Sequence, residues 1–246
     1  MSTSEYICVT SMSRAYYDFI GKYMIESWKK YWDIDLVIYS EDDLSFVNSS
    51  NIFYKDWNTS CLSLWNNFCK LPVHESEKKF AKKGFASLES WKTLDSKKII
   101  WIDADMIFRK NIDSSILKKL LPNDKLISLF THNYCPGRYK GLSSESGFYI
   151  VNTQHKDFNN FVSEYKKIYT STSVPTEISG LGDHKILALT ASKFQSQTED
   201  LSKYRTKDKT TTPLNHSWLS EYMNHYKGKV KDQAGFVEKE ILTNTE

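Results

Sequence analysis

Apolar and polar residues alternate along the chain with two different periods, and these periods predict where strands and helices lie. Short apolar runs at 6–13, 34–43 and 98–105 predict buried strands. Residues 14–32 repeat apolar side chains at helical spacing and therefore predict a helix. A strand, a helix and a second strand in this order are typical of a parallel sheet with a crossover helix.

The alternation continues through the rest of the chain. Further strands are predicted at 125–132 and 146–153, and helices at 85–96, at 155–169 and from about Asp183. Strands and helices that alternate in this way favour an α/β fold, with a mixed, mostly parallel sheet flanked by helices.

Two stretches lack a clear period. Residues 44–84 hold short aromatic-rich pieces, and 196–218 are polar and read as a long loop. Neither stretch marks a domain boundary, so residues 1–246 are expected to form a single domain.

Composition narrows the class of protein. Of the 246 residues 40% are hydrophobic and 26% charged, with nine glycines and five prolines, which indicates an ordinary globular domain. The net charge of +3 is too small to indicate nucleic acid or an acidic membrane as partner. The four cysteines show no metal-ligand spacing and predict reduced thiols. Because neither a signal-peptide pattern nor a membrane-spanning apolar run is present, we expect a cytoplasmic protein.

Two carboxylates interrupt the most apolar segment of the chain. Asp103 and Asp105 are two positions apart, so in an extended segment both side chains point to one face. Two such carboxylates repel each other unless one takes a proton or a cation lies between them. Mg²⁺ or Mn²⁺ suits this site. In the alternative interpretation the strand ends at the surface, where Asp103 caps a turn and Asp105 is solvated, and the spacing alone does not decide between the two.

The segment IIWIDADMIF resembles the DxD strand of the nucleotide-sugar glycosyltransferases of the GT-A fold. The order of elements over residues 5–230 is similar to the glycogenin-like and lipopolysaccharide galactosyltransferase-like retaining members. The resemblance implies a GT-A fold, a donor-binding half at 1–110, an acceptor-side half at 111–230 and a tail at 231–246.

The resemblance also implies a metal site. Asp105 matches a metal ligand, and Asp103 either shares the ion or contacts the ribose. The segment NHYKGKVK is similar to the family's His-x-x-Gly-x-x-Lys, which makes His225 the third ligand, with His216 as its rival. The spacing departs by one position at the lysine. Further residues implied at the leaving diphosphate are Gly228, Lys229 and Lys231.

Other matching positions imply the donor site. Val9, Thr10 and Ser11 lie where the family holds the base and ribose, and Arg14 lies within reach of the diphosphate. Lys92, on the predicted helix before the DxD strand, matches a basic residue near the donor, although an exposed helix lysine explains it equally well.

The segment SSESGFYIVNT resembles the part of the family that meets the donor sugar, through Ser146 and Gly147. Glu145 replaces the usual asparagine, which suggests a carboxylate facing the sugar hydroxyls. A β-bulge is the structural alternative for Ser146-Gly147.

In GLGDHKIL, Asp183 is the candidate near the reacting carbon, either as general base or as a carboxylate that stabilises positive charge, and His184 could orient the acceptor. A plain helix N-cap is the structural alternative for Asp183.

The resemblance thus implies transfer of a sugar, with retention, from a nucleotide diphosphate sugar, expected to be a UDP-sugar, with Mn²⁺ or Mg²⁺ as cofactor. A sugar nucleotidyltransferase is a second hypothesis, but VTSMSRAYYDF lacks the glycine-rich loop of that class. A binding module with a degenerate site, including one that acts on or binds DNA, is a third. The acceptor stays open among saccharides, lipid-linked sugars, proteins and modified DNA bases.

Overall fold

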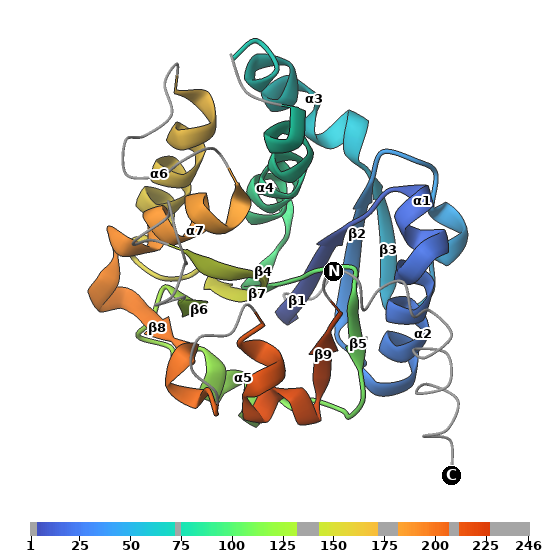
Figure 1. Ribbon diagram of the computed structural model, residues 1–246, viewed down its shortest axis with the longest axis vertical. Coiled ribbons are helices and arrows are strands. Elements are labelled where there is room, and N and C mark those ends of the chain that lie inside the picture. Colours follow the sequence, from blue (N-terminus) through green and yellow to red (C-terminus); the bar gives the residue numbers. More distant parts are fainter. Residues whose placement is uncertain (1–3, 72–74, 132–142, 172–181, 207–211, 227–246) are drawn as a thin grey trace.

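A sheet of seven strands lies at the centre of the part of the chain that the computed structural model describes, residues 4–71, 75–131, 143–171, 182–206 and 212–226 (Figure 1). Its order is β3-β2-β1-β4-β7-β6-β8. Strand β7 pairs antiparallel with both of its neighbours, whereas the other neighbouring pairs are parallel. The strands are β1 (Ser4–Ser11), β2 (Asp35–Ser40), β3 (Ile52–Asp56), β4 (Ser96–Ile102), β6 (Ile127–Thr131), β7 (Ser144–Asn152) and β8 (Thr198–Asp200).

Helices cover both faces of this sheet (Figure 1). They are α1 (Arg14–Tyr16), α2 (Lys22–Tyr31), α3 (Trp57–Phe68), α4 (Glu75–Thr93), α5 (Ser114–Leu120), α6 (Phe158–Thr170) and α7 (Asp183–Ser192), with a π-helical turn at Tyr17–Gly21 between α1 and α2. One core joins the sheet to α3, α4, α6 and α7, and a second joins it to α2 and α5. Sheets covered on both sides have strands that read as continuous apolar runs. The predicted α/β fold, a mostly parallel sheet between helices in a single domain, is therefore confirmed.

Side-chain caps explain where several helices begin. The Asp56 carboxylate accepts a hydrogen bond from the backbone N–H of Asn58 at the start of α3. The Asp113 carboxylate accepts from the N–H groups of Ser115 and Ile116 at the start of α5. Such caps satisfy N–H groups that have no partner inside the helix.

A second, two-stranded ribbon stands beside the main sheet. Strand β5 (Met106–Phe108) follows the turn after β4 and pairs antiparallel with β9 (Met223–His225). In this register Met106 lies opposite His225. The pairing brings His225 beside the residues that end β4.

Several sequence-based predictions of local structure need correction. The stretch 44–84 is largely regular, since it contains β3, α3 and the first half of α4. The helix predicted over 85–96 begins ten residues earlier, at Glu75. The described parts of 196–218 form β8 and short 3-10 turns, where a long loop was predicted. The buried or half-buried side chains of α3, Trp57, Cys61, Leu64, Trp65 and Phe68, do recur at helical spacing, but β3 leads directly into them, so strand and helix read as one irregular stretch.

None of the helices in the described ranges is both long enough and apolar enough to cross a membrane.

Candidate functional site

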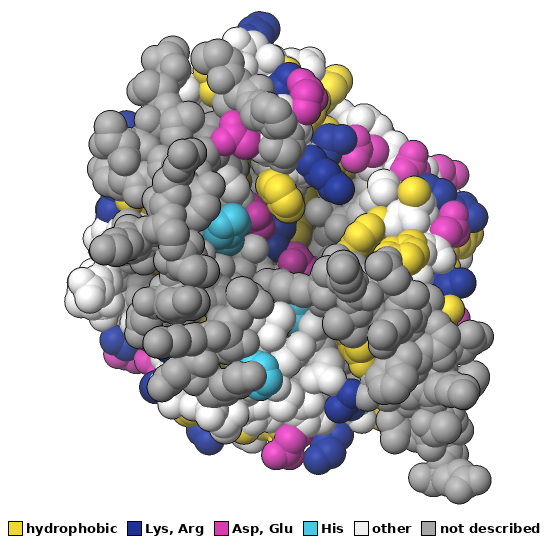
Figure 2. Space-filling model, in the orientation of Figure 1, with side chains coloured by type: hydrophobic (Ala, Val, Ile, Leu, Met, Phe, Trp, Pro, Cys, Tyr) yellow, Lys and Arg dark blue, Asp and Glu magenta, His cyan; other side chains and the backbone are white. Residues whose placement is uncertain are grey.

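A cavity of about 700 Å³ opens at the carboxyl edge of the central parallel strands. Figure 2 shows this face hollowed near its centre, where acidic, basic, histidine and hydrophobic side chains gather. Ligands in open α/β sheets bind at this edge, and the volume lies within the range of small-molecule sites, roughly 300–1,000 Å³. The lining residues are Ser11, Met12, Ser13, Tyr16, Tyr39, Glu41, Trp57, Lys79, Phe80, Lys82, Lys83, Trp101, Asp103, Ala104, Asp105, Ser144, Ser146, Asp183, His184 and His225.

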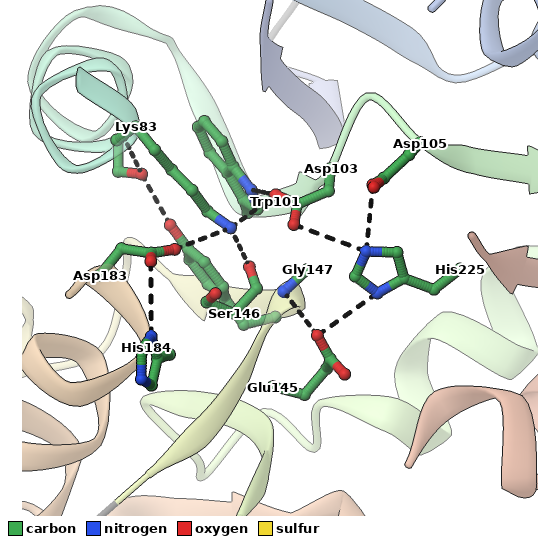
Figure 3. A network of polar contacts seen from close by, with 12 residues as sticks. Lys83, Trp101, Asp103, Asp105, Glu145, Ser146, Gly147, Asp183, His184 and His225 are labelled. Atoms are coloured by element: carbon green, nitrogen blue, oxygen red, sulfur yellow. Dashed lines mark hydrogen bonds and ion pairs between the residues drawn. The ribbon is translucent and has the colours of Figure 1, made fainter. Parts of the chain in front are cut away.

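The floor of the cavity holds a cluster of metal-ligating side chains, Asp103, Asp105 and His225, which we call the acidic cluster (Figure 3). One ligand atom from each lies within 4.8 Å of the others. Nε2 of His225 lies 3.0 Å from Oδ1 of Asp105 and 3.7 Å from Oδ2 of Asp103. Asp105 and His225 are buried, whereas the Asp103 side chain is 27% exposed.

The backbone fixes His225 in this cluster from two sides. The β5–β9 ribbon sets its position opposite Met106. The Asn215 side-chain oxygen accepts from the His225 N–H at 2.7 Å, and the Asn215 side-chain amide donates to the His225 carbonyl at 2.7 Å. Two hydrogen bonds to the backbone of one residue restrict where its Cα can lie, so the point from which the imidazole projects is fixed.

Charge in the cluster changes the protonation of its neighbours. Burial by itself lowers the pKa of His225, but the Asp105 and Glu145 carboxylates outweigh it and raise that pKa to about 9. Burial, followed by the charge of Asp105, raises the pKa of Tyr16, whose hydroxyl donates to Oδ2 of Asp105 at 3.0 Å. The His225 shift and part of the Tyr16 shift thus reflect the negative charge of Asp105.

The chemistry of this donor set fits a divalent cation. Carboxylate oxygens are ligands for Mg²⁺ and Mn²⁺, and an imidazole nitrogen favours a transition metal over Mg²⁺. Asp103, Asp105 and His225 would hold the ion, and the open cavity leaves room for further ligands from a substrate. His216 does not lie in this group, so the structure does not support it as the third metal ligand in place of His225.

A second cluster, Lys83, Asp103, Asp183 and Ser146, lies on the other side of Asp103; we call it the lysine cluster (Figure 3). Nζ of Lys83 lies 2.5 Å from Oδ1 of Asp103 and 3.1 Å from Oδ2 of Asp183. It also donates to the carbonyl oxygen of Ser146. Trp101 completes the surroundings of Asp103 by donating its indole N–H to Oδ1 at 3.0 Å.

The ion pairs in the lysine cluster shift both partners toward the charged form. Burial lowers the pKa of Lys83, but Asp103 and Asp183 more than offset it and raise that pKa. Burial raises the pKa of Asp183, but Lys83, followed by His184, holds it well below its usual range. Asp183 is therefore ionised at any physiological pH. It begins α7 as predicted, but the N-cap is Gly182, and the Asp183 carboxylate contacts side chains of the cavity instead.

Of the three residues expected to hold the nucleotide at the end of β1, only one lines the cavity. Ser11 lines the cavity, while Val9 and Thr10 are fully buried and do not. Arg14 is on the surface, where its guanidinium pairs with Asp18 and lies 4.7 Å from the centre of the Phe46 ring. The structure thus does not bring the Arg14 side chain to the cavity.

The α4 lysines that line the cavity are Lys79, Lys82 and Lys83, of which Lys83 contacts Asp103, and Lys92 is not among them. Lys92 is exposed in the last turn of α4 and does not line the cavity. The helix runs back along the strand that follows it, so its C-terminal end lies near the start of β4. The seven residues of β4 span about 23 Å, which a helix covers in about 15 residues. Counting back by that length from Thr93 leads to Lys78 and Lys79, about one turn before Lys83, so the sequence indicates the N-terminal half of α4 but not which of its lysines reaches Asp103.

The segment Glu145-Ser146-Gly147 begins β7, the antiparallel strand, and therefore reaches the same edge as the ends of its neighbours. Ser146 lines the cavity, as expected. Glu145 is fully buried and faces His225, so the prediction that its carboxylate faces the sugar hydroxyls is wrong. His184 is 40% exposed and lines the cavity beside Asp183. Gly228, Lys229 and Lys231 lie outside the described residues.

No protein-family model matches the chain, and no curated protein matches it either. Solved structures do match. The galactosyltransferase LgtC in complex with donor and acceptor sugar analogs is 12% identical, over 98% of this chain and 96% of that one, with a TM-score of 0.59. The apo form of mouse xyloside xylosyltransferase 1 is 12% identical, over 81% and 86%, with a TM-score of 0.56. The bifunctional glycosyltransferase WbbM is 14% identical, over 99% of this chain and 52% of that one, with a TM-score of 0.59.

The chain has the GT-A glycosyltransferase fold. The Asp103-Asp105 pair at the end of β4 fits the DxD motif of this fold, and the resemblance stated from the sequence is confirmed. In this GT-A chain the acidic cluster and the lysine cluster share Asp103 at the floor of one cavity.

Proposed function

We propose that this GT-A protein is a metal-dependent glycosyltransferase that moves a sugar from a nucleotide diphosphate sugar, a UDP-sugar, to an acceptor hydroxyl with retention of configuration. The observation that carries the proposal is the acidic cluster. Two aspartates and a histidine from segments 120 residues apart in sequence converge within 4.8 Å at the floor of the cavity. The matching structure of LgtC in complex with donor and acceptor sugar analogs supports the class of substrate.

Each side chain of the acidic cluster has a distinct part in holding a cation. Asp105 and His225 are buried and held rigidly, by Tyr16 and by Asn215, and would anchor the ion. Asp103 is the more exposed ligand, and faces the donor. A bound Mn²⁺ or Mg²⁺ supplies Lewis-acid stabilisation of the leaving diphosphate.

The lysine cluster would orient the transferred sugar. Lys83 fixes the Asp183 carboxylate at the cavity wall, and Ser146 lies beside it on β7. Because Asp183 is held ionised by Lys83, it is a weak base, and it acts by stabilising positive charge that develops at the anomeric carbon. The half-exposed His184 faces the cavity next to it and orients the acceptor hydroxyl.

A panel of nucleotide sugars with and without Mn²⁺ tests this function, read by thermal shift and by slow donor hydrolysis. We expect one UDP-sugar to stabilise the wild type only when Mn²⁺ is present. Nucleoside triphosphates are included, because stabilisation by a triphosphate with a sugar phosphate would instead indicate a nucleotidyltransferase. If none of these ligands stabilises the protein, but duplex DNA binds with strong salt dependence, a binding module replaces the enzyme.

The stereochemical part of the proposal has its own test. Once an acceptor is found, NMR of the product gives the configuration at the anomeric carbon. An α-linked donor should give an α-linked product, and a β-linked product would contradict retention while leaving the metal-dependent transfer intact.

A further inference from the structure

A buried glutamate stands directly behind the histidine of the acidic cluster. Glu145 has no exposed surface and does not line the cavity. Its Oε1 lies 3.3 Å from Nδ1 of His225, on the side of the ring opposite the two aspartates (Figure 3). The same oxygen accepts a hydrogen bond from the backbone N–H of Gly147 at 3.2 Å. The Gly147 contact holds the carboxylate where it faces the imidazole.

The two ring nitrogens of His225 therefore face different groups. Nε2 faces Asp105 and Asp103, at 3.0 and 3.7 Å, and Nδ1 faces Glu145. The nitrogen that binds a metal is set by the hydrogen bond that the other nitrogen makes, because a proton on Nδ1 leaves the lone pair on Nε2. Glu145 is an acceptor for a proton on Nδ1, and so directs the lone pair toward the aspartates.

Strand β7 is shaped to hold this ring. A Cβ atom on residue 147 would lie 2.3 Å from Cε1 and 2.7 Å from Nδ1 of His225, so only glycine leaves room for the imidazole. The backbone of His225 is fixed separately by Asn215. The ring is thus confined between the β7 backbone, the Glu145 carboxylate and the two aspartates.

We propose that Glu145 is a positioning residue for the metal site: it orients the His225 ring so that Nε2 is the ligand, and thereby sets the affinity for Mn²⁺. The inference rests on the metal-dependent function proposed above. Carboxylates behind metal-binding histidines usually change metal affinity by about 10- to 100-fold when they are removed.

The test measures Mn²⁺ affinity by electron paramagnetic resonance on the full chain, without substrate. Glu145→Leu removes the acceptor, and we expect Mn²⁺ binding about 10- to 100-fold weaker. Glu145→Gln keeps the volume and a neutral acceptor, and we expect about fivefold weaker binding, because hydrogen bonds to charged acceptors are roughly twice as strong. Asp157→Asn is the matched control, since Asp157 lies 3.8 Å from a different histidine, His155, and should leave the affinity unchanged.

A spectroscopic readout separates positioning from a general loss of stability. Electron spin echo modulation from ¹⁴N in bound Mn²⁺ reports imidazole ligation. We expect it in the wild type and in Glu145→Gln, weakened in Glu145→Leu and absent in His225→Ala. Thermal unfolding of the metal-free variants checks that they are folded, and if Glu145→Leu does not fold, the Gln variant alone decides.

Wild-type affinity in Glu145→Gln, or in a folded Glu145→Leu with full ¹⁴N modulation, would overturn the positioning role while leaving the proposed metal site standing. Failure of the wild type itself to bind Mn²⁺ with ¹⁴N modulation would overturn the metal dependence of the proposed function as well.

Discussion

The acidic cluster and the lysine cluster share Asp103, but their charges are balanced in different ways. In the lysine cluster the protein provides its own cation, since Lys83 lies between Asp103 and Asp183. In the acidic cluster Asp103 and Asp105 face one side of the His225 imidazole, and Glu145 adds a third carboxylate behind the ring. The first arrangement is complete without a ligand, whereas the second is suited to a cation that arrives with the substrate.

This difference indicates which cluster orients the sugar and which one binds a cation. A self-contained ion pair gives a fixed geometry before any ligand binds, which suits orientation of a sugar. A cluster with excess negative charge changes its protonation when a cation enters, as the raised pKa of His225, about 9, already indicates. The predictions that follow separate the two clusters.

Asp105→Asn should have the largest effect. Asp105 is buried and contacts both Tyr16 and His225, so its loss removes a ligand and frees the others. We expect Mn²⁺ binding to fall below detection and transfer to drop by roughly 1,000-fold or more, since metal stabilisation of the transition state is worth several kcal/mol. Calorimetric titration with Mn²⁺ and a transfer assay measure this. The exposed Asp124→Asn is the control, and normal Mn²⁺ affinity in Asp105→Asn would refute the metal site.

Lys83→Met should break the lysine cluster alone. It leaves Asp183 buried without its ammonium partner, which costs about 3–5 kcal/mol of unfolding free energy, and transfer should fall by about 100-fold through lost orientation. Mn²⁺ binding should persist. Chemical denaturation and the transfer assay measure the two effects. Lys92→Met, exposed on the same helix, should change neither quantity; a large effect there would restore Lys92 as a site residue.

Gly147→Ala should disturb the acidic cluster from behind. The added Cβ would lie 2.3 Å from Cε1 of His225, so the ring must move. We expect Mn²⁺ affinity to fall by about 10- to 100-fold. Gly84→Ala is the matched control, because its Cβ would lie 2.1 Å from the hydroxyl oxygen of Tyr169, in the core behind α4. That variant should lose about 1–3 kcal/mol of stability and keep its Mn²⁺ affinity. Equal Mn²⁺ affinities in both variants would argue against His225 as a ligand.

Proton competition should give the smallest effect when it is counted per pH unit. In the metal-free protein the pKa of His225 is about 9, above its ordinary value of 6.5. Below pH 9 the ion must therefore displace a proton from the imidazole, so apparent Mn²⁺ affinity should rise about tenfold per pH unit and level off above pH 9. Mn²⁺ titrations from pH 6 to pH 9 measure the slope. A flat profile would show that His225 does not lose a proton on binding.

Local pattern was enough to predict much of the fold. The strands β1, β2 and β4 are buried on both faces, so each is a short apolar run that cannot be mistaken for a surface helix. The helix α3 was missed although Trp57, Cys61 and Phe68 are buried at helical spacing. Strand β3 ends at Asp56 and α3 begins at Trp57, so the two periods meet with no turn between them and neither stands out.

The candidate site was predicted unevenly for a related reason. Asp103 and Asp105 are neighbours in sequence, so their shared face follows from strand geometry. Lys83 was missed, because the sequence shows a run of lysines along α4 and only the direction of the helix tells which end lies over the cavity. Glu145 was found but given the wrong partner, because residues at a strand entry alternate between the cavity and the interior.

The sequence by itself determined the alternation of strands and helices and the carboxylate pair at the end of β4, because both depend on residues within a few positions of one another. Only the tertiary structure decided which distant groups meet that pair. The β5–β9 register brings His225 to Asp105, and the direction of α4 brings Lys83 to Asp103. Such contacts depend on how whole elements pack, which no short stretch of the chain specifies.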